Sequence, residues 1–162
     1  MESIVIYFSY SGNTREMAKI AAEYTHSDIC ELLSPEPLPK DQKILHDKVV
    51  VEKLFPRQRS PLRMPADTDK YAVFIVGAPL WIGTYPGFFL DHLRSINWRG
   101  RMVYPFISFG GTVGNYYEEL IEICRGARLA PPFEMHSGSR PEEVRKFKLW
   151  LGRINNFTGN IK

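Results

Sequence analysis

The stretch that decides the fold is residues 3–14, which read SIVIYFSYSGNT. Residues 3–8 are a nearly continuous run of β-branched and aromatic residues, which is typical of a strand buried on both faces. Residues 9–14 are small and polar, and apolar residues at helical spacing follow from Met17 to Tyr24. A buried strand, a short polar loop and an amphipathic helix predict the first half of a βαβ unit.

The same alternation continues along the chain. Strand-like runs recur at residues 71–76 and 102–107, although Pro105 removes a ladder donor from the second of these. Weaker signals predict an edge strand over residues 28–33 and an irregular last strand over 127–136. Further helices are predicted after Pro86, around residues 117–124 and around residues 144–154. The fold class is therefore α/β, with a doubly wound open sheet of parallel strands.

The length of 162 residues predicts a single domain over residues 1–162 with one hydrophobic core. Residues 35–69 are rich in proline, and we interpret them as a long excursion that contains one helix at residues 43–55. Residues 155–162 are expected to form a flexible tail.

Cysteine usage, hydropathy and charge indicate the cellular compartment and exclude some classes of protein. Cys30 and Cys124 form no CxxC motif, which favours a reducing compartment and excludes a disulfide scaffold or zinc ribbon. No apolar run has the roughly 20 residues that span a bilayer, and the first residues lack signal-peptide character, so we expect a cytoplasmic protein without membrane contact. Seven basic and three acidic residues between Lys40 and Arg63 form a local basic patch, which does not predict nucleic-acid binding by the whole chain.

Residues 9–14 are the first of three candidate ligand loops. Hydroxyl groups and a glycine precede a helix N-terminus, where free backbone N–H groups and the helix dipole favour an anion. The loop thus predicts a phosphate site, and an ordinary helix cap is the alternative. The chain has neither a GxxxxGK[ST] motif nor a GxGxxG motif, which sets aside both classical nucleotide loops.

Two further loops follow strong strands. Residues 77–86, GAPLWIGTYP, place Trp81 as a stacking platform for a flat ring, unless this side chain only caps the core. Residues 108–116, SFGGTVGNY, offer glycines that let backbone approach a ligand and Tyr116 as a second aromatic wall, unless the loop is only a flexible connection. Because all three loops follow strands at one edge of the sheet, together they predict a site for a flat-ringed mononucleotide.

These loops resemble those of the flavodoxin family. Residues 9–14 are similar to its Ser-x-Thr/Ser-Gly-Asn-Thr phosphate loop, residues 77–86 to its Gly-x-Pro-x-Trp-x-Gly-x-x-Pro segment, and residues 109–115 to its third, glycine-rich loop. The resemblance spans about Ile4 to Ile154. It implies a flavodoxin-like three-layer sandwich with five parallel strands in the order 2-1-3-4-5, which holds FMN without a covalent bond.

The resemblance also implies roles for individual residues. The 9–14 loop would bind the phosphate, Trp81 would contact the isoalloxazine, and Gly83 would carry the peptide that changes its hydrogen bond when the flavin is reduced. Ile82 stands where relatives often have a second aromatic residue. No catalytic residue and no metal ligand are predicted. The predicted cofactor-binding residues are Ser9, Tyr10, Ser11, Gly12, Asn13, Thr14, Pro79, Leu80, Trp81, Ile82, Gly83, Phe109, Gly110, Gly111, Gly114, Asn115 and Tyr116.

The expected function is electron transfer by an FMN-binding flavodoxin-like protein, acting with a redox partner protein. The basic patch suggests an acidic partner that docks near Lys40 to Arg63. One alternative is an FMN-dependent NAD(P)H or quinone oxidoreductase, in which Arg57, Arg59 and Arg63 serve a nucleotide phosphate. Another is a flavodoxin-fold binding module without cofactor. The sequence leaves open whether the protein is an enzyme, and it sets no oligomeric state.

Overall fold

The computed structural model describes residues 2–55, 62–136 and 141–159, apart from the side chains of residues 156–159. Its sheet has the order β2-β1-β3-β4-β5, every pair is parallel, and β6 pairs with β4 beyond the end of β5. The predicted order 2-1-3-4-5 is therefore confirmed. The strands are β1 (Ser3–Tyr7), β2 (Asp28–Glu31), β3 (Val73–Pro79), β4 (Met102–Phe109), β5 (Arg128–Leu129) and β6 (Phe133–His136).

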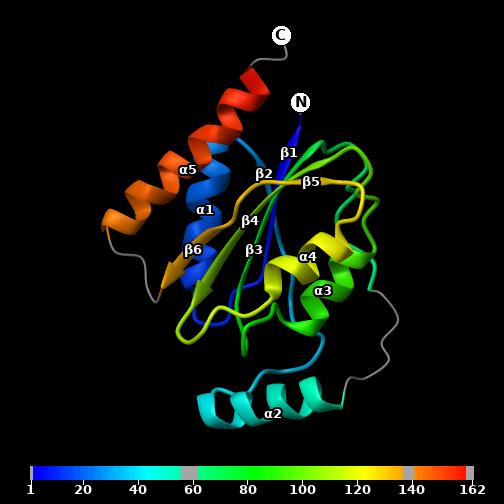
Figure 1. Cartoon of the computed structure of the whole chain (residues 1–162), viewed down its shortest axis with the longest axis vertical. Helices are drawn as coiled ribbons and strands as arrows, with labels where there is room; N and C mark the ends of the chain where they lie inside the picture. The colour runs from blue at the N-terminus through cyan, green and yellow to red at the C-terminus, as the bar shows by residue number, and fades with distance from the viewer. Residues whose placement is uncertain (1, 56–61, 137–140, 160–162) are drawn as a thin grey trace.

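Helices cover both faces of this sheet (Figure 1). On one side lie α1 (Asn13–Thr25) and α5 (Pro141–Gly159), and on the other α3 (Gly87–Arg94) and α4 (Tyr116–Ile123). Successive residues of β1 alternate between the two cores: Ile4 and Ile6 belong to one, Val5 and Tyr7 to the other. Burial on both faces explains why the strand is an unbroken apolar run, and the three-layer sandwich is confirmed.

A difference from the expected strand count explains Pro105. The Met102 amide donates to Ala72 on the β3 side, so by alternation residue 105 points toward the opposite neighbour. On that side β5 ends at Leu129 and β6 begins at Phe133. Pro105 therefore faces the interval in which the last strand is broken, and its missing N–H interrupts no ladder.

The long excursion carries one helix, α2 (Gln42–Leu54), close to the predicted 43–55. The Asp41 carboxylate caps it by accepting from the Lys43 and Ile44 amides at 2.8 and 3.1 Å. Rather than covering the sheet, α2 crosses beyond the edge where the central strands end (Figure 1).

The C-terminal helix is longer than expected. Residues 155–159, predicted as part of a flexible tail, are helical, and residues 160–162 lie outside the described residues. Ile154 is fully buried in the core against α1, and the Asn155 side chain donates to the Tyr24 carbonyl at 3.4 Å. These two contacts favour continuation of the helix beyond the last apolar position of its stripe.

Candidate functional site

A cavity of about 580 Å³ opens at the carboxyl edge of the sheet, where all three predicted ligand loops meet. In an open α/β sheet this is the edge where ligands bind, at the point where the strand order reverses. Its volume lies within the range of small-molecule sites, roughly 300–1,000 Å³. The predicted residues that line it are Tyr10, Ser11, Asn13, Pro79, Leu80, Trp81, Ile82, Gly83, Phe109, Gly110 and Gly111.

The first loop presents the N-terminus of α1 to this cavity. The N-cap residue is Gly12, at φ 100°, which has no side chain to bond to the first-turn amides. The exposed Ser11 and the neighbouring Asn13 line the cavity directly. Because these amides lack a side-chain cap, they favour an anion through hydrogen bonds and the helix dipole. The alternative of an ordinary side-chain cap does not fit a glycine at this position.

Three predicted residues of this loop are not among those that line the cavity: Ser9, Gly12 and Thr14. The Ser9 Oγ accepts a hydrogen bond from the Gly12 amide at 3.1 Å. The buried Thr14 hydroxyl lies 3.1 Å from that of Ser108, at the end of β4. In this structure the two hydroxyls predicted to bind phosphate shape the loop, and the Thr14–Ser108 pair ties the first loop to the third.

Trp81 is half-buried and belongs to both core and cavity. Its ring makes edge-on contacts with Phe8 and Tyr10, with centroids 5.6 and 6.1 Å apart. These contacts fix the indole without enclosing it. Trp81 therefore packs on the core with part of its surface only, and the rest of its surface lines the cavity.

A tight turn holds Trp81 at the cavity. Trp81 and Thr84 exchange backbone hydrogen bonds of 2.8 and 3.4 Å, and the two residues between them, Ile82 and Gly83, have φ angles of 53° and 76°. Positive φ at both central positions is the type I′ arrangement, and it is unusual for a β-branched residue. The Lys53 ammonium on α2 donates to the Ile82 carbonyl. The turn is thus strained at Ile82 and bound to α2.

Fewer residues of the third loop line the cavity than expected. Gly110 and Gly111 are exposed and line the cavity, whereas Gly114 packs against the backbone of Gly83. Asn115 is the N-cap residue of α4 and also lies off the cavity wall. Backbone approach to a ligand is therefore available near the start of this loop.

The prediction of Tyr116 as a second aromatic wall is wrong. Tyr116 starts α4 and is only 1% exposed, with its ring against Tyr85 and its hydroxyl donating to Glu134 at 2.8 Å. Burial, together with the Glu134 carboxylate, raises the pKa of this phenol. The ring points inward because residue 116 lies on the same helix face as the buried Leu120.

Several lining residues were not predicted, and most come from α2. They are Gln42, Leu45, His46, Val49, Ser108 and Thr112. The four α2 residues recur at i, i+3, i+4 and i+7, so one face of this helix covers the cavity. That spacing is visible in the sequence, but it does not indicate which part of the fold the face meets.

Two lysines of the basic patch have partners within the chain. Lys48 pairs with Glu36 at 3.1 Å, and Lys53 is bound to Ile82. Arg57 and Arg59 lie outside the described residues, while Arg63 is exposed.

Comparison with known proteins identifies the family to which this fold and cavity belong. A family model described as Flavodoxin matches residues 2–153. The chain belongs to the flavodoxin family. The resemblance found in the three loops is thereby confirmed, and no curated protein sequence matches the chain.

Solved structures share the flavodoxin fold. A flavoprotein from Bacteroides uniformis is 23% identical, with a TM-score of 0.76 over 93% of this chain and 97% of that one. A flavoprotein from Lactobacillus acidophilus, in complex with FMN, is 22% identical, with a TM-score of 0.66 over 90% of this chain and 97% of that one. Flavodoxin 1 from Bacillus cereus is 21% identical, with a TM-score of 0.61 over 96% of this chain and 98% of that one.

Family membership makes this chain a flavodoxin-like protein, in a family whose cofactor is a flavin. Among the described residues, no helix combines the length and the apolar character needed to cross a membrane.

Proposed function

We propose that this flavodoxin-like protein binds FMN in the 580 Å³ cavity and serves as an electron carrier. The observation that carries the proposal is the convergence there of the uncapped α1 N-terminus, the Trp81 indole and the glycine-rich backbone of the third loop. These are an anion site, a flat apolar surface and a close backbone approach, which match a phosphate, a ring face and a ring edge. The FMN complex of the Lactobacillus acidophilus flavoprotein supports this assignment.

Different residues of the cavity would bind different parts of FMN. The first-turn amides of α1, with Ser11 and Asn13, would hold the phosphate. Trp81 would pack on the isoalloxazine, and the backbone at Gly83 and Gly110 would face its edge. Bound FMN supplies the one- and two-electron chemistry, while the protein orients the ring and excludes water.

The lining favours a carrier over a nicotinamide-dependent reductase. Among the described residues that line the cavity there is no Lys or Arg to receive the phosphates of a dinucleotide. His46 and Tyr10 are the titratable side chains of that lining. We further infer that the carrier meets its redox partner in the cytoplasm. Lys40, just before α2, and Lys43, in its first turn, are exposed and favour an acidic partner surface.

The test is an FMN titration followed by desalting, with wild type, Trp81→Leu, Trp81→Phe and Leu54→Ala. Leu54 is exposed on α2 and does not line this cavity, so it controls for substitution near the site. We expect wild type to retain the flavin, Trp81→Leu to bind at least about tenfold more weakly, and Trp81→Phe to recover most of the affinity through its ring. Leu54→Ala should match wild type.

The retained flavin is then exposed to NADPH without oxygen. A carrier keeps its oxidised spectrum until a separate reductase is added, whereas bleaching by NADPH alone would identify the reductase. Loss of all flavin from wild type on desalting would contradict the proposal and favour a module that shares only the fold.

A further inference from the structure

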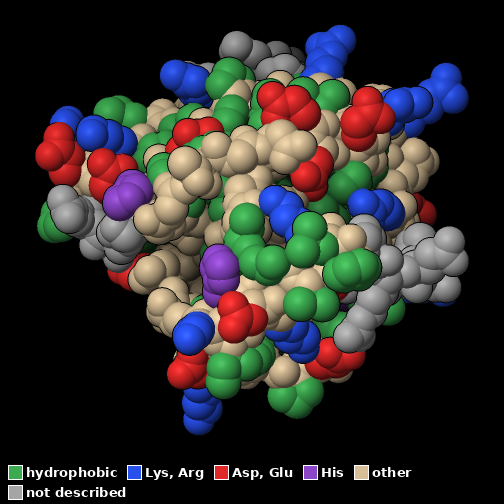
Figure 2. All heavy atoms as spheres, turned by 60° about the horizontal axis from the view of Figure 1, so that its bottom comes forward, with side chains coloured by type: hydrophobic (Ala, Val, Ile, Leu, Met, Phe, Trp, Pro, Cys, Tyr) green, Lys and Arg blue, Asp and Glu red, His purple; other side chains and the backbone are tan. Residues whose placement is uncertain are grey.

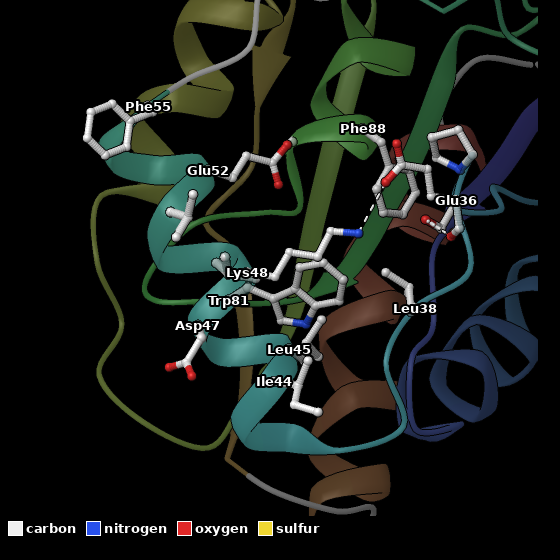
Figure 3. A pocket seen from close by; sticks show the side chains of 15 residues that line it. Glu36, Leu38, Ile44, Leu45, Asp47, Lys48, Glu52, Phe55, Trp81 and Phe88 are labelled. Carbon is white, nitrogen blue, oxygen red and sulfur yellow. Dashed lines mark hydrogen bonds and ion pairs between the residues drawn. The ribbon is translucent and has the colours of Figure 1, made fainter.

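A second cavity, of about 430 Å³, adjoins the first at Trp81. Figure 3 shows its lining: α2 forms one wall, Phe88 on α3 lies opposite, and the segment after β2 contributes Leu38. Leu45, Val49 and Trp81 line both cavities, so the two spaces adjoin along these three side chains. The proposed electron-carrier function does not use this second space.

Apart from Leu45 and Val49, the α2 wall of this cavity is formed by side chains that do not line the first. Ile44, Lys48, Val51, Glu52 and Phe55 recur at i, i+4, i+7, i+8 and i+11, next to the face that covers the first cavity. Three of these side chains are apolar and yet largely accessible, with exposed fractions of 58% for Ile44, 58% for Val51 and 73% for Phe55.

Apolar side chains gather among charged ones of both signs on the face of the molecule that carries α2 (Figure 2). A soluble domain seldom leaves large apolar residues grouped around a hollow unless the hollow receives something. Three aromatic side chains, Phe55, Phe88 and Trp81, border the space, which suits a flat ring better than an aliphatic chain.

The charges around the mouth restrict which ligand can enter. Glu36, Asp47 and Glu52 are acidic, and Lys48 is the basic residue among those that line the cavity. The Lys48 ammonium lies 3.1 Å from the Glu36 carboxylate, an ion pair that joins α2 to the segment after β2 (Figure 3). A rim with an excess of carboxylates repels anions and admits neutral or positively charged molecules.

We propose that this cavity is a second ligand site, which takes a small, flat aromatic molecule that is neutral or cationic. The ligand lies between α2 and Phe88, in contact with Trp81, and both sites are occupied at the same time. The inference does not depend on FMN binding, because apart from Leu45, Val49 and Trp81 the residues that line the second cavity do not line the first.

Two fluorescent probes that differ by one charged group test the proposal. N-phenyl-1-naphthylamine is neutral and aromatic, and 8-anilinonaphthalene-1-sulfonate is the same skeleton with a sulfonate. We expect saturable binding of the neutral probe with one site per chain, and at least about tenfold weaker binding of the sulfonate. Equal affinity for the two probes would overturn the charge argument, and absence of saturable binding would overturn the site.

A pair of variants on one helix locates the probe. Val51→Trp fills the cavity from an exposed position and should raise the dissociation constant of the neutral probe at least about tenfold. Leu54→Trp adds the same ring to the same helix where it lines neither cavity, and should change that constant less than twofold. Equal effects of the two variants would contradict the assigned site.

Competition with FMN separates this inference from the proposed function. The titration is repeated with saturating FMN, and we expect the neutral probe to bind with unchanged stoichiometry. Displacement of the probe by FMN would place it in the flavin cavity and overturn the proposal. A chain that binds the probe but no FMN would leave the second site standing and contradict only the carrier function.

Discussion

Gly83 and Gly114 meet backbone to backbone. A Cβ atom placed on Gly83 would lie 2.8 Å from the Cα of Gly114, and one placed on Gly114 would lie 2.6 Å from the Gly83 carbonyl oxygen. Real Cβ atoms do not approach backbone this closely, so the contact exists only because both residues are glycine. It fixes the turn that carries Trp81 against the third loop, and both segments line the 580 Å³ cavity.

Gly114→Ala should destabilise the protein. Its Cβ would collide with the Gly83 carbonyl, and overpacking of this kind costs about 1–3 kcal/mol of unfolding free energy. Urea unfolding measures the change. Gly111→Ala is the matched control, because a Cβ there meets no atom within 4 Å. If the two variants are equally stable, the two loops are not in contact.

The Thr14–Ser108 pair should behave as one unit. Thr14→Val keeps the side-chain shape but leaves the buried Ser108 hydroxyl without this partner, and Ser108→Ala does the converse. Each change should lower the unfolding free energy by about 1–3 kcal/mol. The double variant should lose less than the two single losses together, as a double-mutant cycle measures. Strict additivity would show that the two hydroxyls do not interact.

Relief of strain at Ile82 should stabilise the protein. Ile82 has a φ of 53° and is 40% exposed, so its side chain contributes little burial in return. Asparagine tolerates positive φ, and Ile82→Asn should raise the unfolding free energy by about 1 kcal/mol, the lower end of the left-handed penalty. Thermal and urea unfolding both report it, and an unchanged or lowered stability would contradict a strained turn.

Stability should fall on acidification through His92. Its Nδ1 atom is buried and has no hydrogen-bond partner among the described residues. Burial lowers the pKa of His92 below 6.5, and the Arg63 backbone and the Asp91 charge offset only part of this. The unfolded chain therefore takes up the proton first. The contribution is complete above about pH 6.5 and is lost as the pH falls from there toward the folded-state pKa.

The check is unfolding of wild type and His92→Gln at about pH 7.5 and 5.5. Wild type should lose more stability between these values than the variant, because the variant lacks the titrating group. Parallel losses in both proteins would show that His92 titrates normally in the folded state.

Part of the flavin cavity could be predicted because the signals are local. Ser11 and Asn13 precede an amphipathic helix, and Trp81 and Gly110 follow buried strands, so topology alone brings them to one edge of the sheet. The prediction for Tyr116 failed because an aromatic residue at the end of a loop fits two interpretations. It can line a ligand site, or it can begin the buried face of the next helix. The packing of α4 against Tyr85 decided between them.

The position of α2 over the cavity could not be predicted. Its helix and capping Asp41 follow from local chemistry, but the contact between Lys53 and Ile82 joins residues 29 apart in the chain. Nothing in the periodicity of residues 42–55 indicates that side chains of this helix line both the proposed FMN cavity and a second one. That depends on where the excursion after β2 crosses the end of the sheet.

The sequence by itself determined the strand and helix pattern and the parallel sheet, because hydrophobic periodicity and turn chemistry act over a few residues. The tertiary structure alone decided the Gly83–Gly114 contact, the Thr14–Ser108 pair across 94 residues of chain, and the two cavities that adjoin at Trp81. These contacts form between segments remote in sequence, so they arise only when the packed core has brought the segments together.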